Sequence, residues 1–301
     1  MLTPLAIAIP TALGPHLDRC LEHLAPALEA AADWKLPGGK DPSGQRNEGP
    51  FATPPVLLIT EAGQGDDVPR TSGVGLEAME APSGSGFASK ANLALQWAQG
   101  LEAELLLLLN DDAFLEPDAL TILLEDMWLS GATAGGMLLV DADPPQAVQS
   151  AGLSVCLRRE RVRAVKELPT NLAERPVPWE VDALPGTALA LRPAFVLSLG
   201  GFDEDFSFYF EDVDLCLRLR QVGHRVVLCP SARAAHVGAG TIGKGPEQAE
   251  KAMRGMRMLL DKHGPGPARG GLAVARALVQ QIRRGPEDLP RRLRAVLDAT
   301  R

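Results

Sequence analysis

The chain alternates short apolar runs with longer segments that are apolar on one side only. Four runs have the length and composition of buried strands, at residues 5–9, 56–60, 105–109 and 225–229. Three segments repeat apolar residues at helical spacing and predict helices, at residues 16–32, 87–99 and 213–222. A short apolar piece also lies around Leu76. Strands that alternate with helices predict the α/β class, with a mostly parallel central sheet and flanking helices.

Two connections in this pattern are rich in glycine and charge, at residues 33–55 and 62–75. The first is long for a connection between a helix and a strand, where about 2–6 residues are usual. We expect it to be a mobile surface loop with rapid hydrogen–deuterium exchange.

Polar residues follow the strands at the edge where ligands bind in open parallel sheets. Pro10 and Thr11 follow the first strand, Glu61 follows the second, and residues 110–112, Asn-Asp-Asp, follow the third. Adjacent carboxylates suit Mg²⁺ or Mn²⁺. Two other interpretations stay open: the aspartates simply end a strand, or Pro117 and its acidic neighbours start the next helix.

A second acidic cluster lies about a hundred residues later, where Glu211 and Asp212 precede a helical pattern. Carboxylates at a helix N-terminus complement the helix dipole, which contributes about 0.3–1 kcal/mol. A carboxylate beside a cleft can instead serve as a general base. His236 follows the last strand, and a single histidine in such a place is more often structural than a ligand.

Composition excludes several classes of protein. Apolar residues make up 46% and charged residues 23% of the 301 residues, which excludes a disordered or fibrous chain. The net charge of −8 gives the molecule as a whole no attraction for nucleic acid. The longest aliphatic run, residues 105–109, is far shorter than the ~20 residues of a membrane helix, and the N-terminus lacks the basic start of a secretion signal. Four widely spaced cysteines indicate neither a zinc site nor a disulfide framework. We therefore expect a reduced, cytoplasmic protein.

Three stretches together resemble the family 2 glycosyltransferases, especially the bacterial rhamnosyltransferase-like branch. They are residues 84–92 (GSGFASKAN), 105–120 (LLLLLNDDAFLEPDAL) and 186–238, which includes GGFDE, FEDVDLCLR and a terminal histidine. The resemblance covers roughly residues 5–240. It implies the GT-A fold, a nucleotide-sandwich domain that holds a nucleotide-diphosphate sugar with a divalent cation, Mg²⁺ or Mn²⁺.

The resemblance also implies roles for individual residues. Residues 110–112 match the family's D-x-D motif, so that Asp112 would bind the metal, with Asp111 and Asn110 beside the donor. His236 matches a histidine that completes the metal site in some relatives.

Asp212 matches the family's catalytic base, with Glu211 as its neighbour. The remaining residues that match donor-binding positions are Pro10, Thr11, Glu61, Lys90 and Asn92.

These roles imply an inverting transferase without a covalent enzyme intermediate. The expected donor is a nucleotide-diphosphate sugar such as dTDP-rhamnose, and the expected acceptor is a saccharide or lipid-linked intermediate of cell-surface polysaccharide synthesis. One departure concerns the second strand, where Thr60 replaces the family's aspartate and Glu61 supplies a carboxylate one position later. This departure leaves open a non-catalytic relative that binds sugar nucleotides. A sugar-nucleotide nucleotidyltransferase is a further alternative, but residues 10–14 lack the Gly-rich basic loop that it needs.

The chain divides into a GT-A domain, residues 1–240, and a basic helical tail, residues 241–301. Helices are expected around residues 253–260, 272–282 and 289–297. The tail either packs on the domain or docks on an anionic membrane surface, which would make the protein peripheral at the inner membrane face. Residues 238–245 nearly spell a P-loop, but Gly245 stands where Ser or Thr must reach Mg²⁺, so we interpret them as a flexible loop near the substrate.

Overall fold

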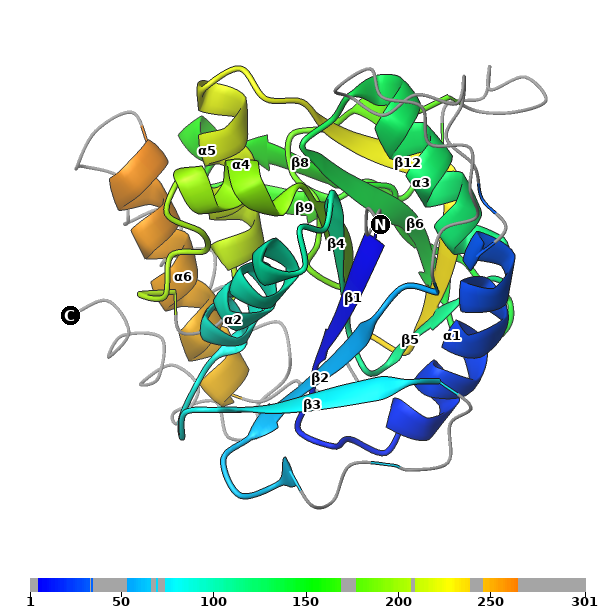
Figure 1. Ribbon diagram of the computed structural model, residues 1–301. Helices are drawn as coiled ribbons and strands as arrows, with labels where there is room; N and C mark the ends of the chain where they lie inside the picture. The colour runs from blue at the N-terminus through cyan, green and yellow to red at the C-terminus, as the bar shows by residue number, and fades with distance from the viewer. Residues whose placement is uncertain are drawn as a thin grey trace.

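The computed structural model has one large mixed sheet with helices on both faces (Figure 1). The residues that it describes are 5–32, 34, 53–65, 69, 74–168, 177–206, 209–238 and 246–264, with only the backbone for 246–249. Most of the 33–55 connection, the glycine-rich residues 239–245 and the tail helices expected at 272–282 and 289–297 lie outside this part of the chain.

One half of the sheet is parallel and contains three of the predicted strands. Its spatial order is β4-β1-β2-β3. The strands are β1 (Leu5–Pro10), β2 (Val56–Glu61), β3 (Leu76–Ala81) and β4 (Leu105–Leu109). The register pairs Ile7 with Val56 and Leu5 with Leu105. The carboxyl ends of β1, β2 and β4 therefore lie at the same edge of the sheet, as the alternation of strands and helices predicted.

The other half is mixed and was largely missed. Here β6 (Ala134–Asp141) and β12 (Val226–His236) run parallel, and β11 (Ala188–Leu191) lies antiparallel between β4 and β6. The shorter strands of this sheet are β5 (Ala113–Leu115), β7 (Val148–Ser150) and β10 (Trp179–Glu180). A separate two-stranded hairpin consists of β8 (Leu153–Cys156) and β9 (Arg161–Ala164), which are connected by the 3-10 turn η3 (Leu157–Arg159). The predicted strand at 225–229 was too short. A bulge between Cys229 and Arg233 absorbs Pro230, which has no N–H to donate, and pairing resumes up to His236.

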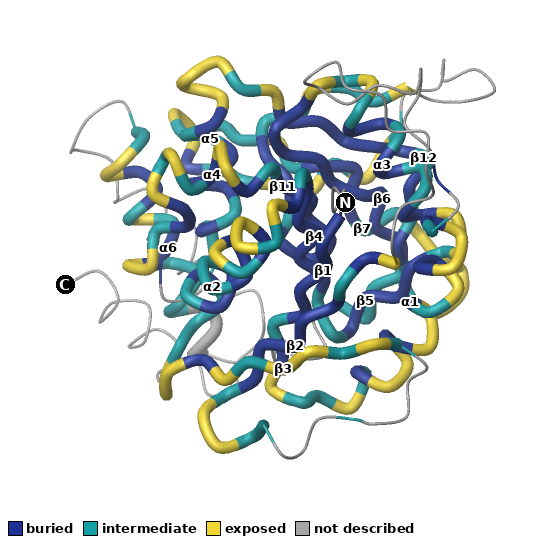
Figure 2. Tube along the Cα trace, in the orientation of Figure 1, coloured by how far each residue is buried: buried dark blue, intermediate teal, exposed yellow. Residues whose placement is uncertain are grey.

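The helices cover both faces of the sheet. α1 (Leu17–Ala32) and α3 (Ala119–Ser130) lie on one face, and α2 (Phe87–Gly100), α4 (Pro193–Ser198), α5 (Glu211–Gln221) and α6 (Pro246–His263) on the other (Figure 1). The strand period of two divides β1 between them: Leu5, Ile7 and Ile9 pack toward α1, while Ala6 and Ala8 pack toward α2. Figure 2 shows the central strands almost wholly buried between these layers.

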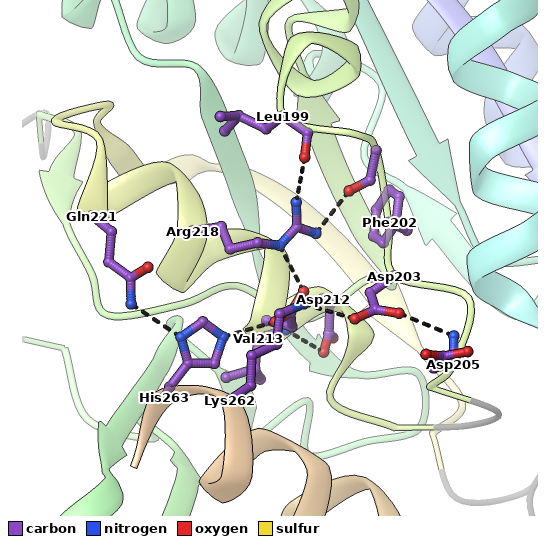
Figure 3. A network of polar contacts seen from close by, with 12 residues as sticks. Leu199, Phe202, Asp203, Asp205, Asp212, Val213, Arg218, Gln221, Lys262 and His263 are labelled. Carbon is purple, nitrogen blue, oxygen red and sulfur yellow. Dashed lines mark hydrogen bonds and ion pairs between the residues drawn. The ribbon is translucent and has the colours of Figure 1, made fainter. Parts of the chain in front are cut away.

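Helix α6, the first part of the predicted tail, packs on α5 through a buried ionic network (Figure 3). The carboxylate of Asp214 has no exposure and accepts bonds from Arg218 Nε at 2.8 Å, Lys262 Nζ at 2.9 Å and His263 Nε2 at 2.7 Å. Burial opposes ionisation of Asp214, but the bonds from His263 and Lys262 and the charge of Arg218 lower its pKa to about 2. The buried side chain of Leu259 adds apolar contact. The network thus holds α5, the helix that begins with Glu211 and Asp212.

Two further features are the absence of a membrane-spanning helix from the described residues and the state of the cysteines. No helix in the described ranges is both long enough and apolar enough to cross a membrane. All four cysteines carry free thiols, and three of them, Cys20, Cys216 and Cys229, are buried.

Candidate active site

Four of the predicted donor-binding side chains meet at the carboxyl edge of the parallel strands. Thr11 donates its hydroxyl to Asp111 Oδ2 at 2.6 Å. Lys90, which comes from α2, donates to Thr11 O and to Glu61 Oε1, both at 3.0 Å. Only 8% of the Lys90 side chain is exposed, so its charge requires such partners. We call Thr11, Glu61, Lys90 and Asp111 the donor cluster, and Pro10 directly precedes it as the last residue of β1.

The end of β2 shows how the chain accommodates its departure from the family pattern. Thr60 is fully buried and its hydroxyl has no hydrogen-bond partner. Glu61, one position later, points to the opposite side of the strand and is 39% exposed. The alternation of the strand thus places the carboxylate of Glu61, rather than the hydroxyl of Thr60, in the donor cluster.

Asp112 and His236 meet beside this cluster although 124 positions separate them in the sequence (236 minus 112). His236 ends β12, which pairs with β5 directly after Asp112, and Asp112 Oδ1 lies 3.2 Å from His236 Nε2. Within the described residues no three His, Cys, Asp or Glu side chains come close enough to form a metal site by themselves. Mg²⁺ is usually held by one or two carboxylates together with phosphate oxygens and water, so Asp112 fits such an ion, and His236 offers an imidazole nitrogen beside it.

Glu211 and Asp212 begin α5 after an unusual turn. Tyr209 and Phe210 both adopt the left-handed region, with φ of 69° and 71°, which costs roughly 1–2 kcal/mol for each such residue. Strain of this kind is typical of functional sites. The turn brings Asp212 to the backbone N–H groups of Gly186, at 2.8 Å from Oδ2, and of Val213, at 2.7 Å from Oδ1.

The two neighbouring carboxyl groups are not equivalent. Glu211 is 8% exposed and its Oε2 has no hydrogen-bond partner. Burial, followed by the charge of Asp212, raises the pKa of Glu211 to about 8. Desolvation also raises the pKa of Asp212, but its two N–H donors oppose that shift by stabilising the carboxylate. When the pair holds one proton, the proton therefore belongs on Glu211 and the charge on Asp212.

A two-residue segment before β11 joins Asp212 to Asn110, the residue that directly precedes Asp111 and Asp112. Gly186 N–H binds Asp212, and the next residue, Thr187, accepts the N–H of Asn110 at 2.8 Å. A Cβ on Gly186 would lie 3.0 Å from Phe87 Cζ, so the close approach favours glycine. No local sequence pattern predicts a role for Gly186 or Thr187, because their partners are determined by the pairing of β11 with β4.

Asn92 lies apart from the donor cluster. Its amide donates to Phe202 O at 3.0 Å and to Glu204 Oε1 at 2.7 Å, and it accepts Phe202 N–H at 2.8 Å. The side chain thus fastens α2 to the loop that contains the GGFDE sequence. Its predicted role in donor binding has no contact in the structure that supports it, and stays a prediction.

Comparison with known proteins identifies the family. No family profile matches the chain. The chain is 30% identical over 259 residues to an N-acetylglucosaminyl-diphospho-decaprenol L-rhamnosyltransferase of Mycobacterium tuberculosis, over 80% of this chain and 78% of that protein. The chain belongs to the rhamnosyltransferase-like family 2 glycosyltransferases. This glycosyltransferase is also 38% identical over 56 residues to rhamnosyltransferase WbbL of Escherichia coli, over 19% of the chain and 21% of WbbL.

Solved structures confirm the GT-A fold. GalNAc-T7, crystallised with UDP, GalNAc and Mn²⁺, matches with a TM-score of 0.61 and 12% identity, over 99% of this chain and 55% of that one. Residues 1–349 of TarS from S. aureus match with a TM-score of 0.52 and 13% identity, over 99% of this chain and 81% of that one. The mannosyltransferase PcManGT from Pyrobaculum calidifontis, in complex with GDP-Man and Mn²⁺, matches with a TM-score of 0.51 and 16% identity, over 99% of this chain and 74% of that one. Membership of this family favours the transferase over the nucleotidyltransferase alternative.

Proposed function

We propose that this glycosyltransferase is an inverting, divalent-cation-dependent enzyme that transfers rhamnose from a nucleotide-diphosphate donor to a lipid-linked saccharide. The observation that carries the proposal is the pairing of Asp112 with His236 at the same sheet edge as the donor cluster, joined through Gly186 and Thr187 to Asp212. The name of the mycobacterial relative supports rhamnose as the sugar and an N-acetylglucosaminyl-diphospho-polyprenol as the acceptor.

In this proposal the donor cluster binds the nucleotide, and Asp112 and His236 would hold the cation that neutralises the diphosphate. Glu61 and Asp111 offer carboxylate oxygens to the hydroxyl and N–H groups of a nucleoside, while Lys90 keeps Glu61 and the Thr11 carbonyl in place. Asp112 and His236 would hold Mg²⁺ or Mn²⁺. A bound divalent cation neutralises the negative charge that develops on the departing diphosphate.

Asp212 acts as the general base. The acceptor hydroxyl attacks the anomeric carbon from the face opposite the diphosphate and gives its proton to Asp212, while the bond between the sugar and the phosphate oxygen breaks. One displacement inverts the anomeric centre and leaves no sugar on the enzyme. The N–H groups of Gly186 and Val213 fix the carboxylate, and protonated Glu211 adds no second negative charge beside it.

The place of action follows from the proposed acceptor. A polyprenyl diphosphate lies in a membrane, and the arginines of residues 241–301 offer a cationic segment for its anionic surface. We therefore include peripheral contact with the inner face of a membrane, in the cytoplasm, in the proposal.

The test is a transfer assay with dTDP-rhamnose and an N-acetylglucosaminyl-diphospho-polyprenol, with Mn²⁺ or with EDTA. We expect transfer that requires the cation, and a product whose anomeric configuration, measured by NMR, is opposite to that of the donor. Transfer that persists in EDTA would refute the cation requirement, and retained configuration would refute the single displacement.

Two variants separate catalysis from binding. Asp212→Asn should bind dTDP like the wild type, measured by thermal stabilisation, but lose about 10²–10⁴-fold in kcat. Asp205→Asn, a matched change on the exposed neighbouring loop, should keep full turnover. Turnover by Asp212→Asn at the wild-type rate would assign the base to another group.

A further inference from the structure

We infer that Gln149 is a positioning residue that fixes the tautomer of His236 so that a nitrogen lone pair faces Asp112. Gln149 lies outside the motifs that carry the family resemblance. The inference rests on the proposed cation dependence, because it concerns how the chain prepares a ligand for that cation.

Both ends of the Gln149 amide contact the same residue. Gln149 Nε2 donates to the backbone carbonyl of His236 at 2.8 Å, and Gln149 Oε1 lies 2.9 Å from His236 Nδ1. The N–H of Ala142 donates to the same carbonyl at 3.1 Å, so the backbone at His236 is held from two sides.

The carbonyl decides which way the amide of Gln149 points. Only the NH₂ group can face His236 O, because a carbonyl oxygen accepts and never donates. Oε1 must then face Nδ1, and an oxygen that only accepts requires a proton on that nitrogen. Neutral His236 therefore carries its proton on Nδ1 and has its lone pair on Nε2.

The lone pair on Nε2 points toward a carboxylate. Asp112 Oδ1 lies 3.2 Å from Nε2, and 6% of the Asp112 side chain is exposed. In the Nδ1–H tautomer no hydrogen lies between these two atoms, so an oxygen and a nitrogen acceptor face each other. A cation that both atoms ligate would satisfy this arrangement. Metal-bound histidines typically donate their other ring N–H to an oxygen in this way.

The fold explains why Gln149 can reach His236. β6 pairs Leu139 with Ser150 and Val140 with Val148, so Gln149 is the extra residue of a β-bulge. Bulges redirect side chains and are common beside active sites. Two residues beyond the end of β12, Gly238 has φ of 73°, and a Cβ there would lie 3.2 Å from Gln149 Nε2. The glycine therefore leaves room for the amide.

The first test measures the tautomer directly in metal-free protein. Long-range ¹H–¹⁵N NMR at pH 8.5 distinguishes protonated from unprotonated ring nitrogens, and only five histidines contribute signals. The His236 signals are assigned by their loss in His236→Ala. We expect a proton on Nδ1 alone in the wild type and a loss of this preference in Gln149→Met. A proton on Nε2 of the wild type would overturn the inference.

The second test measures the consequence for metal binding. Mn²⁺ is titrated into protein saturated with dTDP, and free Mn²⁺ is followed by EPR. Gln149→Met should weaken Mn²⁺ binding by about 10- to 100-fold. Gln149→Glu keeps an oxygen for the Nδ1 proton and should retain affinity within about threefold of the wild type.

The two variants are matched controls for each other. Both lose the bond from Gln149 Nε2 to His236 O, whereas only Gln149→Glu keeps an acceptor for the Nδ1 proton, together with an added negative charge. Equal losses of Mn²⁺ affinity in the two variants would show that Gln149 supports only the backbone of His236 and would overturn the inference. If the wild type binds no Mn²⁺, the cation dependence of the proposed function fails, and the NMR result still decides how Gln149 acts on His236.

Discussion

The substitution Glu211→Gln tests the assignment of the shared proton to Glu211. Glu211 is 8% exposed, its Oε2 lacks a partner, and its pKa is raised from 4.5 to about 8. A shift of one pKa unit corresponds to ~1.4 kcal/mol, so a shift of about 3.5 units corresponds to roughly 5 kcal/mol. That figure is an upper bound, because local relaxation and water entry reduce the cost of burying a charge.

The direction of the pH dependence follows from comparing how tightly the folded and the unfolded chain hold the proton of Glu211. The folded protein holds this proton more tightly, so the stabilisation is complete below pH 4.5 and is lost as the pH rises to about 8. Glutamine cannot ionise and does not share this loss. From pH 5 to pH 9, the free energy of unfolding of the variant should therefore rise relative to that of the wild type, by up to roughly 5 kcal/mol.

Urea unfolding followed by the fluorescence of the four tryptophans provides the assay, at pH 5, 7 and 9. A difference in the free energy of unfolding that is the same at all three pH values would reflect only the new amide. Glu22→Gln, the same change at an exposed position of α1, is the control for the loss of a carboxylate as such. Parallel pH profiles for Glu211→Gln and wild type would refute the assignment of the proton to Glu211.

Three further substitutions test contacts around the site. Asp214→Asn leaves Arg218 and Lys262 without their carboxylate and should cost about 3–5 kcal/mol in urea unfolding, whereas Lys262→Met, at a side chain 35% exposed, should cost about 1 kcal/mol or less; equal costs would contradict the network. Lys90→Met should weaken dTDP binding about tenfold in calorimetry, and unchanged affinity would remove Lys90 from the donor cluster. Gly186→Ala should lower kcat at unchanged dTDP affinity, since the new Cβ pushes the Gly186 N–H away from Asp212; an unchanged kcat would show that this bond is dispensable.

The sequence was informative where a signal is local. Five leucines followed by Asn-Asp-Asp predicted β4 and its polar end, and the helical repeats predicted α1 and α2 almost to their ends. Apolar periodicity works here because each of these elements buries one face, or both, against the same core. The helix at Glu211 begins two residues earlier than its apolar pattern, because a left-handed turn at Tyr209 and Phe210 starts it.

Apart from residues 225–229, which predicted the start of β12, the mixed half of the sheet carried no such signal. β11 is four residues long and lies antiparallel between β4 and β6, while β5, β7 and β10 have two or three residues each. Strands this short are stabilised by partners far away in the chain, so local composition does not predict them.

The sequence by itself determined which chemical groups the site contains: the acidic pairs at 111–112 and 211–212, Lys90 and His236. Only the tertiary structure decided which of them meet. It brought Asp112 to His236 and Gly186 to Asp212, bonded Asn92 of α2 to the loop that contains Phe202, and added Gln149, 87 positions from the histidine that it contacts. These contacts depend on the order and register of strands, which are chosen by the packing of the whole sheet. A side chain's neighbours along the chain therefore carry little information about them.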